Sequence, residues 1–143
     1  MALAAPTAAF VIDVSACMPW CCEDEATPVS EALLLRAAAG ERLHVPSLWP
    51  WEMMNALSAA TRRRRISVEQ ASAFLDFLAE FSIEIAAPPK ITDLPRLHTL
   101  AARNQLTAYD AAYLDLAKLL AIPLATLDGD LIKAARAEGL TVL

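Results

Sequence analysis

The residues with the clearest capacity for chemistry are four acidic side chains that lie far apart in the sequence. They are Asp13, Glu52, Asp110 and Asp128. Glu52 lies in the stretch SLWPWEMMNAL, where almost all of its neighbours are apolar. Burying an ionised carboxylate without a partner is costly, so such a group needs a partner or a chemical role. Carboxylates offer only oxygen ligands, and a cluster of them selects a hard cation, Mg²⁺ or Mn²⁺.

The elements that must position these acids alternate between strand-like and helical patterns. Short apolar runs predict five strands, at residues 8–13, 43–46, 83–87, 123–127 and 140–143. Helical patterns cover residues 26–39, 47–65, 67–81, 91–104, 107–121 and 129–139. This alternation predicts an α/β protein, a three-layer α/β/α sandwich around a parallel sheet of about five strands. The length of 143 residues predicts a single domain over residues 1–143.

The predicted topology brings the acids to one edge of the sheet. Ligand sites gather at the carboxyl ends of parallel strands, where the N-termini of the returning helices also lie. Asp13 and Asp128 follow strands, Glu52 and Asp110 lie in first helical turns, and Asp130 is beside Asp128. Two carboxylates ~4 Å apart repel by roughly 4 kcal/mol at an effective dielectric of ~20, and a dication removes that cost. Carboxylates with Mg²⁺ suit phosphodiester chemistry, in which the metal neutralises the phosphate and activates a water.

Each acid also has a purely structural explanation. Asp110 can form a Thr-x-x-Asp capping box with Thr107, and Asp128 can cap the last helix. Asp13 can simply begin a loop. Taken singly, Asp110 and Asp128 favour the structural explanation, but four acids at one edge favour a shared site.

The charge balance limits the role of nucleic acid as a partner. The formal net charge is −5, so bulk attraction to a polyanion is not expected. The exception is the run RRRR, Arg62 to Arg65. It is explained either as a solvated helix end or as a contact with RNA phosphates or an acidic partner. Arg62 is ten residues beyond Glu52, about 15 Å along a helix, so these arginines reach flanking RNA and not the scissile phosphate.

Cysteine usage and hydropathy bear on the compartment. Cys17, Cys21 and Cys22 are odd in number and close in sequence, which argues against a disulfide framework. Small buried apolar groups explain them better than a zinc site does. Residues 1–14 lack Lys and Arg and contain Asp13, so we expect no secretion signal. No run approaches the ~18 apolar residues of a membrane span, so we expect a cytoplasmic protein with no membrane contact.

Four segments together resemble a known family. VIDVSA, WEMMNAL, TAYDAAYLDLA and LATLDGDLIKAA occur in the order and spacing of the PIN-domain ribonucleases, and the closest likeness is to the VapC-type toxins of bacterial toxin–antitoxin pairs. The resemblance implies a sheet ordered 3-2-1-4-5, which would place Asp13 beside Asp128. It also implies a Mg²⁺-dependent endoribonuclease that cleaves RNA, forms a homodimer and is covered by a cognate antitoxin protein.

The resemblance assigns roles to individual residues. The metal-binding and catalytic acids would be Asp13, Glu52, Asp110 and Asp128, with Asp130 as a helper or substitute for Asp128. The supporting residues would be Ser15, Asn55 and Thr126.

Aromatic residues flank the same edge. Trp20, Trp49, Trp51 and Tyr109 are placed to stack on a base or to receive an antitoxin side chain, although we expect at least two to serve packing. Tyr113 and Leu116 have helical spacing with Tyr109 and are interpreted as core.

Two alternatives come from other classes of protein. A haloacid-type phosphatase needs a second Asp where Ser15 stands, and a receiver domain needs a phosphoacceptor Asp near Pro88 and Pro89. Both patterns are missing, which disfavours a phosphohydrolase or signalling domain. A non-catalytic PIN-like module that binds a partner would keep the acids for folding and would show no metal-dependent cleavage.

Overall fold

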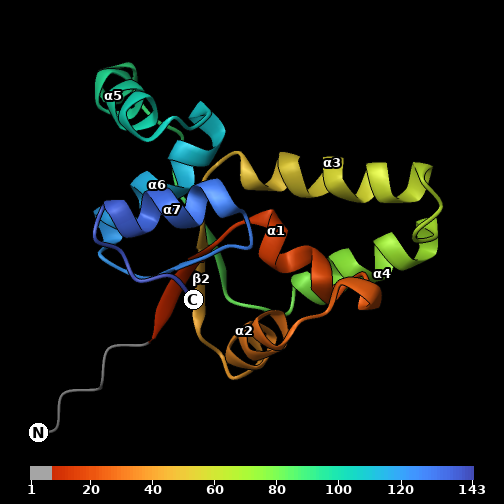
Figure 1. Cartoon of the computed structure of the whole chain (residues 1–143). Helices are drawn as coiled ribbons and strands as arrows, with labels where there is room; N and C mark the ends of the chain where they lie inside the picture. The colour runs from red at the N-terminus through yellow and green to blue at the C-terminus, as the bar shows by residue number, and fades with distance from the viewer. Residues whose placement is uncertain (1–7) are drawn as a thin grey trace, which may run out of the picture.

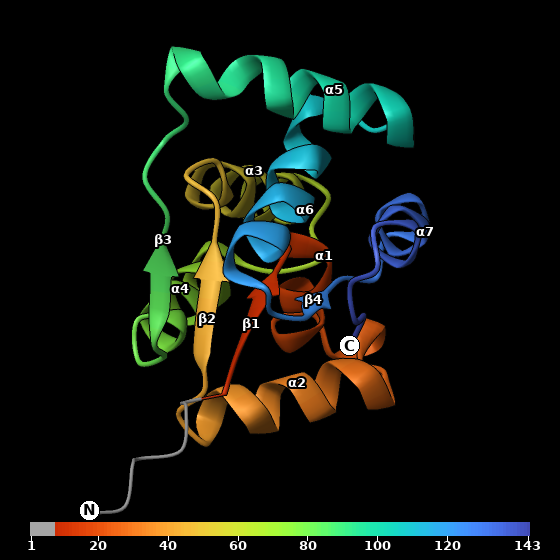
Figure 2. The same ribbon diagram turned by 90° about the vertical axis from the view of Figure 1, so that its left-hand side faces the viewer.

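The sheet has four parallel strands in the order β3-β2-β1-β4, shown in Figure 2. The computed structural model describes residues 8–143, so the sequence interpretation of residues 1–7 lies outside the described residues. The strands are β1 (Ala9–Ile12), β2 (Arg42–Val45), β3 (Ile83–Ile85) and β4 (Leu124–Ala125). The parallel sheet and the neighbouring first and fourth strands are as predicted.

The fifth predicted strand is reduced to a bridge. Val142 pairs in parallel with Leu124 of β4, and Leu124 exchanges backbone hydrogen bonds with Thr141 and Leu143. Residues 141–143 therefore lie on the predicted side of β4, and the sheet has four strands where about five were predicted.

Helices cover both faces of the sheet, as Figures 1 and 2 show. The helices are α1 (Val14–Cys17), α2 (Pro28–Ala38), α3 (Trp49–Arg62), α4 (Val68–Leu78), α5 (Leu94–Asn104), α6 (Ala108–Leu120) and α7 (Gly129–Ala137). Short 3-10 turns add η1 (Met18–Trp20), η2 (Glu23–Glu25) and η3 (Ile91–Asp93). Helices α1 to α4 lie on one face, α6 and α7 lie on the other, and α5 packs against α6.

Local sequence signals explain where several helices begin. Ser67 and Gln70 form the predicted capping box at the start of α4, with reciprocal hydrogen bonds of 2.8 and 3.0 Å. Pro95 lies in the first turn of α5, where its missing N–H has no intrahelical partner to lose. The proline therefore starts this helix at Leu94 without disrupting it.

The core is centred on β1 and α6. Phe10, Val11 and Ile12 of β1 are completely buried. Helix α6 crosses the sheet with Leu114 and Tyr113 also in the core. Because the core holds β1 and α6 together, the residues at the carboxyl end of β1 and at the N-terminus of α6 have fixed relative positions.

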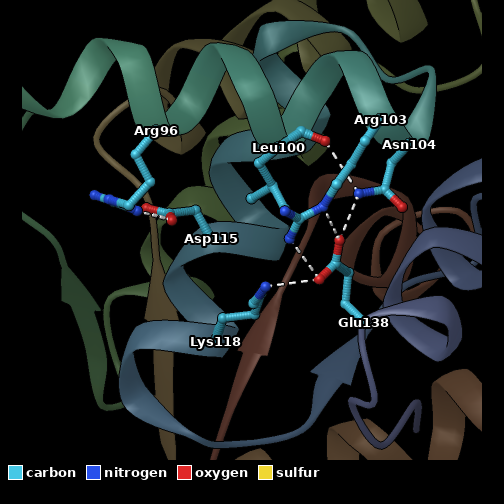
Figure 3. Close-up of polar contacts among 7 residues, drawn as sticks. All are labelled: Arg96, Leu100, Arg103, Asn104, Asp115, Lys118 and Glu138. Carbon is cyan, nitrogen blue, oxygen red and sulfur yellow. Dashed lines mark hydrogen bonds and ion pairs between the residues drawn. The ribbon is translucent and has the colours of Figure 1, made fainter.

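A polar cluster at the surface fastens α5 and α6 to the end of α7, as Figure 3 shows. The carboxylate of Glu138 accepts hydrogen bonds from Arg103 at 2.6 and 2.8 Å, from Asn104 at 2.8 Å and from Lys118 at 2.7 Å. Its side chain is only 12% exposed. These bonds, led by that from Arg103, lower the pKa of Glu138 to about 2. The cluster ties three helices together through one charge.

Glu138→Gln is expected to lower the free energy of unfolding at neutral pH. It is also expected to make that free energy fall less as the pH is lowered. A depressed pKa gives stability that is present above the ordinary value of 4.5 and is lost as pH falls toward about 2. Urea unfolding between these pH values measures the difference. Glu69→Gln, at the exposed start of α4, serves as the control and should match the wild type. Equal acid sensitivity in wild type and Glu138→Gln would contradict the expectation.

Candidate functional site

Asp13 lies where β1 ends, and it begins helix α1. The residue is 6% exposed, and its Oδ1 accepts a hydrogen bond from the Ala16 backbone N–H at 3.2 Å. Burial raises the pKa of Asp13 to about 6, against the opposing effect of hydrogen bonds from Ser15, Thr126 and Ala16. The nearby charge of Asp128 raises the pKa further. The fold therefore holds a carboxylate that is unfavourable in its ionised form.

Two hydroxyl groups fasten Asp13 to the loop after β4. Ser15 donates to Oδ1 of Asp13 at 2.6 Å, and Thr126 donates to Oδ2 at 2.6 Å. Each hydroxyl also accepts from the backbone of the loop: Ser15 from Leu127 at 2.9 Å and Thr126 from Asp128 at 3.0 Å. The two supporting residues identified in the sequence thus bridge the first acid and the segment that carries Asp128.

Glu52 lies in the first turns of α3 and is bonded to α6 across the site. The Tyr113 hydroxyl donates to Oε1 of Glu52 at 2.5 Å. Burial raises the pKa of Glu52, the bond from Tyr113 opposes this, and the charge of Asp110 adds to it. Tyr113 is 2% exposed, and burial together with the Glu52 carboxylate raises its pKa strongly, so it remains a donor. The sequence interpretation of Tyr113 as core was correct about burial but missed this bond.

The other acids lie at the N-termini of α6 and α7. Thr107 caps α6 by accepting from the Asp110 N–H at 3.1 Å, and no hydrogen bond within residues 8–143 runs from the Thr107 backbone to the Asp110 carboxylate. The predicted capping box is therefore only half formed, which leaves the carboxylate of Asp110 without that structural duty. Asp128 does cap α7, since its Oδ1 accepts from the Leu131 N–H at 2.9 Å. Asp130 is exposed in the first turn of α7.

Mutual repulsion links the five acids. Burial raises the pKa of Asp110, the charges of Asp128 and Asp130 raise it further, and the Thr107 side chain opposes this. The charge of Asp128 likewise raises the pKa of Asp13, and the charge of Asp110 raises the pKa of Glu52. Each acid is therefore within the electrostatic range of at least one other, at the edge where β1 and β4 end. Positive charge from outside the chain would relieve this repulsion.

The donor set suits a hard divalent cation, because it consists of carboxylate and hydroxyl oxygens. Within residues 8–143, no three His, Cys, Asp or Glu side chains are close enough together to hold one metal ion. The chemistry and the charge of the site thus fit a dication. Simultaneous coordination by three acids requires their side chains to move closer together.

Two groups of predicted residues make no hydrogen bond to the acids within residues 8–143. Asn55 is exposed one turn after Glu52, and no hydrogen bond within the described chain joins it to the acids. Arg62 to Arg65 lie at the opposite end of α3. Neither group takes part in the hydrogen bonds around Asp13.

The aromatic residues divide into packed and exposed pairs. Trp20 donates to the Ser30 carbonyl at 2.9 Å, and Trp49 is buried, so these two serve packing as expected. Trp51 is 73% exposed and Tyr109 is 66% exposed. Each is next to an acid in the sequence, Trp51 beside Glu52 and Tyr109 beside Asp110. Because both side chains are exposed, both are available to a base or a partner side chain.

The cysteines agree with the packing interpretation. Cys17 and Cys22 are buried, Cys21 is half-buried, and all three are free thiols. Burial is the main cause that raises the pKa of each thiol. None belongs to a group of side chains that could hold a metal ion within residues 8–143.

An apolar groove lies next to the site. Its volume is about 840 Å³, and it is formed by α5, α6 and the segments that follow β2 and β3. The lining includes Pro46, Leu97, Ala112 and Leu116, and Tyr109 connects the groove to the N-terminus of α6.

In the part of the chain that the structure describes, no helix is long and apolar enough to cross a membrane.

Comparison with known proteins identifies the class. The PIN domain family model matches residues 10–137, so the chain belongs to the PIN domain family. Within that family, Ribonuclease VapC3 of Pyrobaculum aerophilum is 31% identical over 121 residues, which make up 85% of this chain and 90% of the relative. The chain is thus a PIN domain of the VapC ribonuclease group.

Solved structures agree on the architecture. A protein of Pyrobaculum aerophilum, PAE2754, has a TM-score of 0.72 at 23% identity and covers 95% of this chain and 90% of its own. VapBC2 of Rickettsia felis, bound to a DNA fragment from its promoter, has a TM-score of 0.65 at 16% identity, with coverages of 94% and 97%. These likenesses confirm the predicted α/β fold.

Proposed function

We propose that this PIN domain is a Mg²⁺-dependent endoribonuclease, able to use Mn²⁺, and that it is the toxin of a type II toxin–antitoxin pair. One observation carries the proposal: acids from four distant segments lie at a single edge of the sheet, where burial, and to a smaller extent the charges of neighbouring acids, raise the pKa of Asp13, Glu52 and Asp110. A cluster of this kind is costly unless a cation offsets the charge. The name of the VapC3 relative, a ribonuclease, supports RNA as the substrate.

The acids would hold the cation, and their neighbours would hold the acids. Asp13, Glu52, Asp110 and Asp128 are the proposed ligands, with Asp130 as a helper. A bound dication supplies charge neutralisation to the phosphodiester and lowers the pKa of water.

The neighbours of these acids set their orientation. Ser15 and Thr126 fix both oxygens of Asp13, and Tyr113 fixes one oxygen of Glu52. Asp110 makes no capping bond to the Thr107 backbone in the described chain, so its carboxylate can orient the attacking water as a general base.

The proposal includes the assembly and the location that the family resemblance implies. We propose that residues 1–143 form one domain, that the protein is a cytoplasmic homodimer, and that a cognate antitoxin covers the site. The groove beside α5 suits contact with a second copy, because Leu94 and Leu119, which line it, are large, apolar and exposed.

RNA cleavage by the purified protein tests the enzymatic function. With a mixed RNA pool, cleavage is expected in millimolar Mg²⁺ and is expected to stop in EDTA. Asp110→Asn should lower the rate at least ~100-fold, as expected when one electrostatic stabiliser of the reaction is removed. Gel analysis of end-labelled RNA gives the rates.

Asp76→Asn is the matched control, because Asp76 is exposed on α4 and belongs to a different layer of the fold. It should cleave as the wild type does. Cleavage that continues in EDTA or in Asp110→Asn would refute the mechanism. A folded protein that never cleaves RNA in Mg²⁺ would instead support the alternative, a non-catalytic module that binds a partner.

A further inference from the structure

The turn between α3 and α4 presents four consecutive arginines. Helix α3 ends at Arg62 and α4 begins at Val68, and Figure 1 shows α4 returning beneath α3. Arg64 has a left-handed φ of 57°, and backbone bonds from Arg64 to Thr61 and from Arg65 to Ala60 close the helix end. The turn is thus a defined helix cap that displays four guanidinium groups at the end of a hairpin.

Arg65 differs from the other three arginines because the protein neutralises it. Its guanidinium lies 2.9 Å from Glu25 and 3.4 Å from Asp24, both in η2. These acids raise the pKa of Arg65, with the bond to Glu25 as the largest cause. Arg65 therefore anchors the hairpin to the segment before α2. The sequence alone did not separate it from its neighbours.

Arg62, Arg63 and Arg64 keep their charge for an external partner. All three are exposed, and among the described residues 8–143 no ion pair or side-chain hydrogen bond engages them. The whole protein has a net charge of −5 and only 12 Lys and Arg residues, so this turn concentrates its positive charge. Three adjacent like charges repel one another, and binding to closely spaced anions relieves that repulsion.

The distance from the acids suits a nucleic-acid strand. Arg62 lies ten residues beyond Glu52 on the same helix, so the two are about 15 Å apart along its axis. That is the length of about four or five stacked nucleotides at ~3.4 Å each. A strand with its scissile phosphate at the acids would therefore reach the turn with phosphates a few nucleotides away.

We infer that Arg62, Arg63 and Arg64 form a phosphate-binding clamp for single-stranded RNA that flanks the cleavage site, and that Arg65 fixes the clamp to the body. The inference rests on the proposed function, because it takes RNA as the substrate. Contacts of this kind read charge and not base identity, so the clamp strengthens binding to any sequence. It requires a substrate that extends several nucleotides beyond the cut.

The salt dependence of RNA binding tests the clamp. Fluorescence anisotropy with a labelled 20-nucleotide oligouridylate in EDTA measures binding without cleavage. The triple variant Arg62→Ala/Arg63→Ala/Arg64→Ala should reduce the slope of log Kd against log salt by about 2, at ~0.7 for each lost phosphate contact. Between about 50 and about 200 mM salt, the wild type should therefore lose about twentyfold more affinity than the variant.

Two further variants separate the charge of the clamp from the fold. Arg62→Lys/Arg63→Lys/Arg64→Lys should keep the wild-type slope. Arg65→Ala should lower the slope less than the triple Ala variant does, because Arg65 is already neutralised and only fixes the turn to the body. An unchanged slope in the triple Ala variant overturns the inference, and so does an equal loss in Arg65→Ala. Unchanged RNA binding with lost binding of polyglutamate would assign the turn to an acidic protein and likewise overturn it. Binding in EDTA remains readable even if cleavage is never observed, so a failure here is distinct from failure of the proposed function.

Discussion

Asp13→Asn is expected to stabilise the metal-free protein at neutral pH while it removes RNA cleavage. Burial raises the pKa of Asp13 from 3.8 to about 6. A folded-state pKa above the unfolded value gives stability that is present at low pH and is lost as pH rises through about 6. At pH ~7 the buried carboxylate therefore costs about 3 kcal/mol, at 1.36 kcal/mol for each pKa unit. Asparagine keeps the shape of the side chain without the charge.

Denaturation of both proteins in EDTA measures this effect. At pH ~7 the variant should unfold several degrees higher than the wild type, and near pH 4 the difference should disappear because Asp13 is then protonated. Mg²⁺ should raise the melting temperature of the wild type more than that of the variant, since a ligand stabilises only the state that binds it.

Asp76→Asn is the control for these measurements, because Asp76 is exposed and should show no gain. A variant as stable as the wild type at pH ~7, or less stable, would show that the hydrogen bonds to Asp13 already compensate for its burial. The ionised Asp13 carboxylate would then not destabilise the fold.

A gain in stability in Asp13→Asn would mean that the ionised Asp13 is unfavourable in its buried position. It would explain why hydrogen-bonding residues surround it. Ser15 and Thr126 each use the hydroxyl hydrogen for Asp13 and accept a backbone N–H from the loop after β4. These bonds hold an ionised carboxylate in position at a cost to stability. The ionised Asp13 lowers the stability of the fold but is already oriented to bind a cation. Such a loss of stability is common at functional sites.

The parallel sheet and the strand-end positions of two acids were predictable from one-dimensional patterns, whereas the order of the strands came from the family resemblance. Asp13 and Asp128 come directly after apolar strands, and the parallel order puts the ends of neighbouring strands at one edge. The cap at Ser67 was also predictable, because both partners lie within three residues. Helix α1 was not, since four residues are too few to show a helical period.

Contacts between distant segments were beyond prediction. Glu52 and Tyr113 are 61 residues apart, and nothing in the spacing of either segment indicates their bond. Arg65 lies 40 residues from Glu25, and the run RRRR gives no sign that one of its members is paired. A tyrosine on the buried face of a helix has the same pattern whether it only packs or also donates a hydrogen bond. Such pairs depend on the crossing of the helices, which the sequence periodicity does not specify.

Tyr113→Phe is expected to weaken metal binding about 10- to 100-fold, the loss typical when a residue that orients a metal ligand is removed. The Tyr113 hydroxyl donates to Glu52 at 2.5 Å and is too strongly buried to ionise, so it fixes one carboxylate oxygen wherever Glu52 is ionised. Phenylalanine fills the same space and leaves that oxygen free to rotate. Titration calorimetry with Mn²⁺ gives the dissociation constant directly, without reference to cleavage.

Tyr109→Phe is the matched control, since Tyr109 lies one turn earlier on α6 and is largely exposed. It should bind Mn²⁺ as the wild type does. A merely structural role for Tyr113 would lower the melting temperature in EDTA and leave the Mn²⁺ affinity of the folded protein unchanged, and that result would contradict the expectation. Because Glu52 is half-buried and water can replace the lost donor, we expect only about 1 kcal/mol of destabilisation. A large change in affinity with a small change in stability would thus identify Tyr113 as a positioning residue for Glu52.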